Sequence, residues 1–261
     1  MLLESLGVRS NQLIVHTALS SFGHIDGGAR ALCEALVSTV GDNGTVVMPA
    51  FTYAETLTPV SGSTRKPPAF HPEMRVSAEI GVTAETFRHL PAVLRSNHPT
   101  HSFAAWGKQA REMLSTQRDN NPFGPLKKLN VLQGYVLLLG TTLQSATAVH
   151  LAEERLDLPY LSRRTATRIN AAGYDERVVL EKMPGCSVAF SKLEERLDPS
   201  KIRSQPLARG VARKIPVRYL VTLATALLES DPRAFICEQS ECASCAAKRE
   251  AFGNTANSAV G

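Results

Sequence analysis

The stretch YVLLLGTTLQSATAVHLAEE, residues 135–154, joins the most apolar run of the chain to a segment with helical spacing. A short continuous apolar run that is closed by a glycine is typical of a strand buried on both faces. Thr147, His150 and Glu153 follow at intervals of three, which places them along one side of a helix. A buried strand that leads into a helix is the repeating unit of α/β proteins.

The same alternation continues on both sides of this stretch. Hydrophobic periodicity and glycine or proline boundaries predict strands at 12–16, 44–49, 101–107 and 176–183. They predict helices at 28–41, 77–90, 108–117, 188–197 and 217–230. Residues 56–72 form a polar loop that is too long for a simple turn. We therefore expect one α/β domain over residues 1–261, with a smaller C-terminal extension from about residue 160.

Composition places the chain among compact globular proteins. Of its 261 residues, 43% are hydrophobic and 20% are charged, and no apolar stretch approaches the roughly 20 residues of a membrane helix. The N-terminal residues MLLESLGVRS carry an acid where a signal peptide needs basic residues. These features predict a cytoplasmic protein without a membrane segment.

The net charge of +5 is concentrated in part in KIRSQPLARGVARKIPVR, residues 201–218, which holds six basic residues and no acid. Such a run is typical of a solvated face, and the alternative is a surface that binds an anion. Because aromatic residues are not interleaved with the charges, the run does not indicate nucleic-acid binding.

Five cysteines make an odd number, which does not favour a complete disulfide framework. Cys237, Cys242 and Cys245 form a C-x4-C-x2-C pattern, but no histidine follows His150 to complete a zinc site. Cys186 is the remaining candidate for a fourth ligand. We interpret these cysteines as reduced structural thiols and expect no metal.

The spacing of His150 and Glu153 suits a general base, because a carboxylate fixes the tautomer of an imidazole and stabilises its charged form. The alternative is a solvated helix face. His98 and His101, in SNHPTHSF, offer a second possibility: with His150 and Glu153 they make the ligand set of a zinc hydrolase. The loop in residues 15–29 is rich in glycine and hydroxyl groups and suits an anion or an oxyanion, although it matches no standard nucleotide loop.

Taken in order, several stretches resemble the aminoglycoside 3-N-acetyltransferase family, also called the antibiotic N-acetyltransferases. They are LIVHTALSSFGHIDGGARALCEAL, GTVVMPAFTY, RSNHPTHSFAAWGKQA, NPFG, GYVLLLGTTLQSATAVHLAE and DPRAFICEQSECASC. The resemblance implies the fold of that family, an α/β sandwich with a central mixed sheet flanked by helices and distinct from the GNAT fold. It also implies acetyl-coenzyme A as donor and a primary amine of an aminoglycoside as acceptor, without a metal, in a monomer or homodimer.

The resemblance assigns roles to individual residues. His150 is the general base, Glu153 orients it, and Thr147 steadies the base or the tetrahedral intermediate. The residues expected to hold the coenzyme are His16, Thr17, Ser20, Ser21, Phe22, Gly23, His24, Ser102 and Phe103. Those expected on the acceptor side are Tyr53, Asp119, Asn121, Glu154 and Asp157.

Two stretches depart from the usual pattern of the family. The segment PFGPLKKL, residues 122–129, lacks the longer Ser-Pro insertion of many relatives, and the first loop reads HTALSS where His-Ser-Ser is commoner. Both affect the expected choice of acceptor more than the reaction. The same chemistry on a different amine therefore stays open as an alternative.

Overall fold

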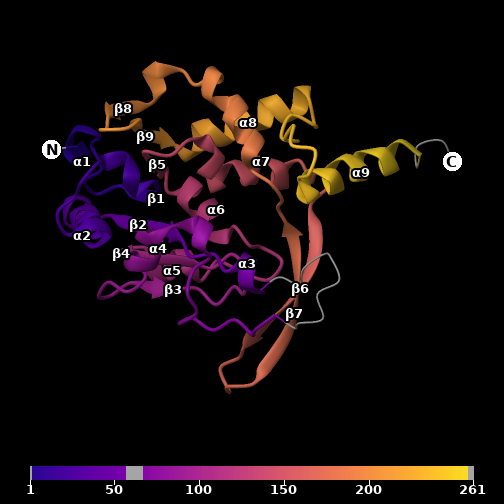
Figure 1. Cartoon of the computed structure of the whole chain (residues 1–261), viewed down its shortest axis with the longest axis horizontal. Helices are drawn as coiled ribbons and strands as arrows, with labels where there is room; N and C mark the ends of the chain where they lie inside the picture. The colour runs from indigo at the N-terminus through magenta and orange to yellow at the C-terminus, as the bar shows by residue number, and fades with distance from the viewer. Residues whose placement is uncertain (1, 57–66, 258–261) are drawn as a thin grey trace.

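The computed structural model describes residues 2–56 and 67–257; the greater part of the expected loop 56–72 lies outside the described residues. Within these ranges the central sheet has seven strands in the order β3-β4-β2-β1-β5-β9-β8, and a separate two-stranded sheet holds β6 and β7 (Figure 1). The strands of the central sheet are β1 (Gln12–Thr17), β2 (Thr45–Pro49), β3 (Leu94–Arg95), β4 (Phe103–Gly107), β5 (Tyr135–Leu139), β8 (Arg203–Pro206) and β9 (Val211–Pro216). The two-stranded sheet consists of β6 (Ser162–Ile169) and β7 (Asp175–Met183).

The middle of the sheet is parallel and its edges are antiparallel. β1 pairs in parallel with β2 and with β5, while β4 and β9 add to the outer sides of this triplet in antiparallel fashion. The parallel strands are buried on both faces, which explains why their sequences are continuous apolar runs rather than alternating ones. The sheet is therefore mixed, as expected.

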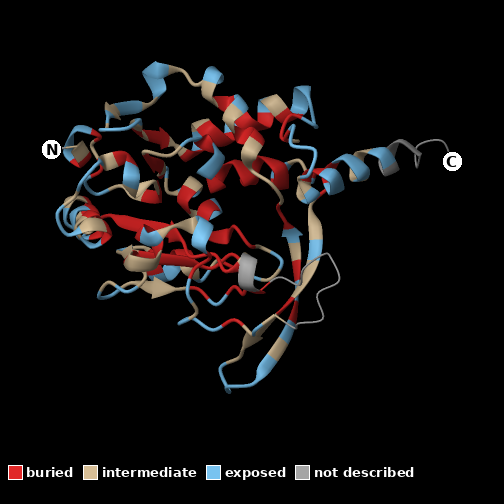
Figure 2. Cartoon of the chain, viewed as in Figure 1, coloured by how far each residue is buried: buried red, intermediate tan, exposed pale blue. Residues whose placement is uncertain are grey.

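Helices cover both faces, because successive side chains of a strand point to opposite sides. Ile14, Val136 and Leu138 face one apolar cluster, whereas Leu13 and Leu137 face the other. The helices are α1 (Leu2–Ser5), α2 (Gly28–Val40), α3 (Tyr53–Thr56), α4 (Val82–Phe87), α5 (Ala110–Leu114), α6 (Gly124–Val131), α7 (His150–Arg155), α8 (Val217–Ser230) and α9 (Ala243–Asn257). Buried residues fill the sheet and the helix faces against it, while the end of the β6–β7 arm and much of α9 are exposed (Figure 2).

Some predicted elements have different limits in the structure. The single helix expected at 77–90 was wrong: Gly81, at φ 94°, separates a 3-10 turn (Ala78–Ile80) from α4. The segment 188–197 forms a 3-10 helix over Val188–Arg196 rather than an α-helix. The helix expected at 108–117 is limited to α5.

The chain beyond residue 160 contributes to both sheets. β6 and β7 form an arm that extends from the body, whereas β9 pairs with β5 along its whole length (Figure 1). The basic run 201–218 therefore forms the β8–β9 hairpin and the start of α8 rather than one solvated face. Lys214, in the middle of this run, is buried, and its ammonium donates to the carbonyl of Gly7 at 2.6 Å.

Candidate active site

A cavity of about 520 Å³ opens at the carboxyl edge of the parallel strands. Its walls include the ends of β1 and β2, the loop after β5 and the first residues of α7. In open α/β sheets, ligands bind at this edge, where the loops that leave neighbouring strands separate. The volume lies in the range of pockets that bind small molecules.

His150, at the start of α7, lies in the wall of this cavity and forms a close pair with Glu153. The His150 Nδ1 atom lies 2.5 Å from Oε2 of Glu153. Because an ionised carboxylate only accepts hydrogen bonds, this contact places the proton of a neutral imidazole on Nδ1. Nε2 is then the unprotonated nitrogen, which is the form that a general base requires.

Glu153 is fully buried and receives two further hydrogen bonds at its other oxygen. Its Oε1 atom accepts from the hydroxyl of Tyr160 at 2.8 Å and from the ammonium of Lys248, on α9, at 3.0 Å. Burial raises the pKa of this carboxyl, but the charges of His150 and Lys248 and their hydrogen bonds outweigh burial and lower it to about 2. Glu153 is therefore a fixed negative charge behind His150 at neutral pH.

Tyr160 and two phenylalanines surround the His150–Glu153 pair. Burial, then the charge of Glu153, raises the pKa of Tyr160, so its hydroxyl stays protonated and donates. The His150 ring stacks on Phe123, with 5.4 Å between centroids, and meets the edge of Phe190 at 4.8 Å. This packing and the Glu153 bond together restrict the ring to one orientation, as a positioned base needs.

Several predicted site residues meet at the same cavity. Thr147 lies in its wall within a 3-10 turn (Thr147–Val149) that precedes α7, and His16, Thr17 and Tyr53 also line it. His16 is buried, and its Nε2 atom has no hydrogen-bond partner among the described residues. Burial lowers the pKa of His16 to about 3, so the ring is neutral and its polar edge is available to a ligand.

The serine-rich loop lies outside the described lining of the cavity, after the end of β1. Leu19–Phe22 forms a 3-10 turn in which the hydroxyl of Ser21 donates to the carbonyl of Gly140 at 2.9 Å. The Ser21 carbonyl accepts from the backbone N–H of Arg209 at 2.8 Å, so the tip of the β8–β9 hairpin contacts this loop. Ser20, Gly23 and His24 are exposed and Phe22 is half-buried.

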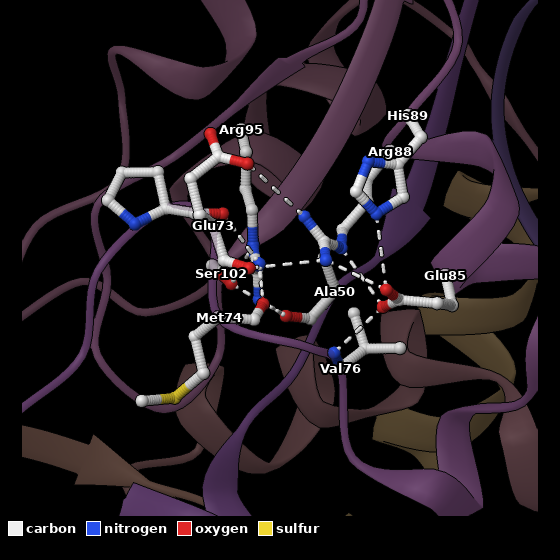
Figure 3. A network of polar contacts seen from close by, with 10 residues as sticks. Ala50, Glu73, Met74, Val76, Glu85, Arg88, His89, Arg95 and Ser102 are labelled. Atoms are coloured by element: carbon white, nitrogen blue, oxygen red, sulfur yellow. Dashed lines mark hydrogen bonds and ion pairs between the residues drawn. The ribbon is translucent and has the colours of Figure 1, made fainter. Parts of the chain in front are cut away.

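Ser102 and Phe103 lie in the interior instead of the cavity wall. The Ser102 hydroxyl donates to the carbonyl of Ala50 at 2.7 Å and accepts from Nε of Arg95 at 3.1 Å, within the polar network of Figure 3. Phe103 is fully buried at the start of β4 and packs edge-on against Phe51. In this structure both residues hold the loop that carries His98 and His101 to the sheet.

The expected acidic residues of the acceptor side, and Asn121, lie away from the described lining and are engaged elsewhere. Asp119 accepts a bidentate pair of hydrogen bonds from Arg168, on β6, at 2.8 and 3.2 Å. Lys127 donates to both Asn121 and Glu154 at 2.6 Å. Asp157 forms a longer ion pair of 3.7 Å with Lys182. These contacts fasten the β6–β7 arm and α6 to the body, and the acceptor role of the four residues stays a prediction.

His98 and His101 do not join His150 and Glu153 in a metal site in the part of the chain that the structure describes. The one group there that brings together three or more suitable side chains is a cluster of cysteines. Nδ1 of His98 accepts the backbone N–H of His101 at 3.1 Å, which shapes the loop, while His101 lines the cavity. The ligand set of the zinc-hydrolase alternative is therefore not assembled.

His98 leads to a prediction about acid stability. It is 3% exposed, and burial, followed by the charge of Arg168, lowers its pKa from 6.5 to about 3. Below pH 6.5, His98 is therefore protonated in the unfolded chain but stays neutral in the folded chain. The contribution of His98 to the free energy of unfolding is fully present above this pH and is lost as the pH falls toward 3. Between about pH 7 and pH 5, His98 alone should remove about 2 kcal/mol from the free energy of unfolding.

Urea unfolding of the protein and of a His98→Gln variant at both pH values measures this contribution. The variant should lose about 2 kcal/mol less than the parent protein between the two conditions. Equal losses in the two proteins would show that His98 is protonated in the folded state. His16 and His101, whose pKa values burial also lowers, contribute with the same sign in both proteins.

Two parts of the site had no signal in the sequence pattern. Lys248 contacts Glu153 from a helix far along the chain, and nothing in its local sequence distinguishes it from other surface lysines. Glu79 lies in the cavity wall next to Ile80, on the short turn before α4. Among the described residues that line the cavity, it is the only one with a carboxylate side chain. Only the tertiary structure brings Glu79 to the cavity and Lys248 to Glu153.

A comparison of the sequence with protein-family models gives a match over most of the chain. The model of a family described as aminoglycoside 3-N-acetyltransferase matches residues 14–229. Aminoglycoside N(3)-acetyltransferase IV of Salmonella sp is 33% identical over 241 residues, which are 90% of this chain and 87% of that protein. A Bacillus subtilis protein named SPbeta prophage-derived aminoglycoside N(3')-acetyltransferase-like protein YokD is 35% identical over 180 residues, 63% of this chain. The matched region spans 66% of the length of the Bacillus protein, just under two thirds.

Solved structures agree over most of the chain. A histidine-to-alanine mutant of the aminoglycoside acetyltransferase AAC(3)-IVa, in complex with a gentamicin, matches with a TM-score of 0.78 at 31% identity. This match covers 95% of the present chain and 94% of the other. AAC-IIIb in a binary complex with CoASH matches with a TM-score of 0.75 at 25% identity, over 87% and 93% of the two chains.

Proposed function

The chain belongs to the aminoglycoside 3-N-acetyltransferase family, and we propose that it transfers the acetyl group of acetyl-coenzyme A to the 3-amino group of an aminoglycoside, with His150 as general base. The observation that carries this proposal is the His150–Glu153 pair in the cavity wall. It is a base held in one tautomer, at the edge of the sheet where α/β proteins bind ligands.

The reaction needs a base because the acceptor attacks as a neutral amine and must lose one proton when its nitrogen becomes part of an amide. Nε2 of His150 takes a proton from the acceptor amine as the amine nitrogen attacks the thioester carbonyl. The new C–N bond forms, the C–S bond breaks, and the proton on His150 passes to the departing sulfur. Glu153 stabilises the charge that His150 carries between these steps, because its own pKa keeps it ionised. No metal ion takes part in this sequence of proton transfers.

The two substrates approach His150 from different sides of the cavity. The turn Leu19–Phe22 lies against Arg209 at the tip of the β8–β9 hairpin, where the exposed side chain of this arginine suits a phosphate of the coenzyme. His16 and Thr17, at the end of β1 just before this turn, line the cavity on the side proposed for the pantetheine arm. His16, with its unpartnered Nε2 atom, offers a hydrogen bond to a polar group of that arm.

The acceptor side is the wall that carries Tyr53 and Glu79. An aminoglycoside is polycationic, so a carboxylate in the wall favours its binding through charge. Glu79 is exposed toward the solvent edge of the cavity and has this role in the proposal. Residues 57–66 lie outside the described residues.

Release of the coenzyme A thiol tests the proposed function. The assay contains acetyl-coenzyme A with gentamicin, kanamycin, neomycin, apramycin or buffer alone. We expect release that depends on an aminoglycoside. If thiol release occurs only with a different amine, the protein is still an acetyltransferase, but its acceptor is not an aminoglycoside. If the coenzyme does not bind, the assignment of the coenzyme site is wrong.

The described part of the chain holds no helix that is both long and apolar enough to cross a bilayer. A small-molecule acceptor is the partner that the proposal requires. The cytoplasmic location and the choice between monomer and homodimer stay predictions from the sequence.

A further inference from the structure

Cys186, Cys237, Cys242 and Cys245 come together beside α9, although Cys186 lies far from the other three in the sequence. Their four sulfur atoms all lie within 4.8 Å of one another. In a tetrahedral zinc site with Zn–S bonds of about 2.3 Å, the sulfur atoms are about 3.8 Å apart, so small side-chain rotations close this cluster around an ion. We propose that the four cysteines bind one structural Zn²⁺ ion as thiolates.

The spacing of the cysteines supports zinc as the ligand. Cys242 and Cys245 are separated by two residues, the spacing that recurs in structural zinc sites, and α9 begins between them at Ala243. Four thiolates match the soft, tetrahedral preference of zinc and leave no open position for a substrate. This differs from the metal-free thiols expected from the sequence, because Cys186 supplies a fourth ligand that spacing alone could not place.

The backbone around the cluster already donates to its sulfur atoms. The N–H of Val188 lies 3.4 Å from Sγ of Cys186, and the N–H of Cys237 lies 3.2 Å from Sγ of Cys245. Hydrogen bonds of this kind orient metal-bound thiolates and reduce their excess negative charge. The hydroxyl of Ser244 accepts from the N–H of Cys186 at 2.8 Å and joins the two segments directly.

The way α9 packs indicates what a bound ion would stabilise, namely the attachment of this helix to the body. Among the helix residues 243–253, whose side chains are described, Cys245 and Lys248 are the buried ones. A helix that docks through an apolar stripe buries several hydrophobic side chains, whereas α9 leaves much of its surface in solvent (Figure 2). A bond between Cys245 and the metal ion would attach α9 to the body of the protein, where its apolar packing is limited.

The position of Lys248 connects the cluster to the active site. Cys245 and Lys248 are three residues apart on α9 and therefore lie on the same side of the helix. The Lys248 ammonium donates to the carbonyl of Cys186 at 3.1 Å as well as to Glu153 at 3.0 Å. An ion that fixes Cys186 and Cys245 therefore also fixes the lysine that neutralises Glu153, without touching the reacting atoms.

Metal analysis of the purified full chain, prepared under reducing conditions without added chelator, tests the site directly. We expect about one zinc ion per chain, as for a closed four-cysteine site. Cys242→Ser and Cys186→Ser should each lose most of this zinc. The matched control is Cys33→Ala, because Cys33 is buried against α4, outside the cluster, and its removal should leave the zinc content unchanged.

A spectroscopic measurement on the unmodified sequence keeps the test independent of how the variants fold. After exchange of the metal for Co²⁺, tetrahedral thiolate ligation gives sulfur-to-cobalt charge-transfer bands and intense visible bands, which octahedral surface binding does not give. A chelator or a mercurial reagent that removes the metal should also lower the thermal midpoint. A metal-free chain without the cobalt bands, or a chain whose four cysteines form two disulfides, would overturn the proposal.

The zinc proposal and the proposed function fail separately. A chain that acetylates aminoglycosides but holds no zinc would contradict the first and support the second. A chain that contains zinc but does not transfer acetyl groups would support the zinc site and contradict the proposed function.

Discussion

His150→Ala lowers kcat by about 10²-fold to 10⁴-fold, while the dissociation constant of coenzyme A stays close to that of the parent protein. This is the expected result because a positioned base contributes most of its effect to the proton transfer itself. His150 lies in the cavity wall, but the coenzyme is expected to bind mainly through the loop after β1. The loss should therefore fall on kcat rather than on coenzyme binding.

The measurement compares initial rates of thiol release with coenzyme binding by calorimetry. His150→Asn serves as a second variant, since its planar side chain fills more of the space between Phe123 and Phe190. His89→Ala is the matched control, because His89 is largely exposed and lies outside the cavity wall. Rates within a few-fold of the parent protein in both His150 variants would remove His150 from the role of base.

Lys248→Met lowers the free energy of unfolding by about 3–5 kcal/mol, the second large effect that we expect. Lys248 is 2% exposed and Glu153 is fully buried, so loss of the ammonium leaves a carboxylate in the interior with less compensation. Glu153→Gln leaves the buried ammonium of Lys248 without its charged partner and should cost a similar amount.

The double variant decides whether these losses come from the ion pair. Combining Lys248→Met with Glu153→Gln removes both charges and should cost about 1–3 kcal/mol less than the sum of the single changes. Lys128→Met is the matched control: its partner Glu112 is exposed, so the loss should stay below about 1 kcal/mol. Additive losses in the double variant, measured by urea unfolding, would contradict a coupled pair.

The elements that could be predicted from the sequence are those with a continuous apolar run or a regular apolar side. β1, β2 and β5 are strands buried on both faces, and α2 has a regular apolar side that ends at Gly41. β6 was missed because SRRTATRI is rich in arginine, and it forms a strand only by pairing with β7. β9 was missed for a related reason: Arg213 and Lys214 obtain their partners, Glu194 and Gly7, from distant parts of the chain.

The candidate site shows the same limit. The spacing of His150 and Glu153 survives in the structure because both residues belong to one short helix. Tyr160 and Lys248, which share the second oxygen of Glu153, come from other segments and have no common motif. Ser102, in contrast, lies in a stretch that resembles the family and was expected to bind the coenzyme. In the structure its hydroxyl accepts a hydrogen bond from Arg95 and donates one to the carbonyl of Ala50.

The position of α9 in the chain has a consequence for biosynthesis. Every strand of both sheets, and His150 itself, precedes Lys248 in the order in which a ribosome makes the chain. A nascent chain can therefore complete its sheet while Glu153 still lacks its cationic partner, and the carboxylate must remain hydrated or protonated during that interval. Translation thus places the final charge of the active site after the framework that surrounds it.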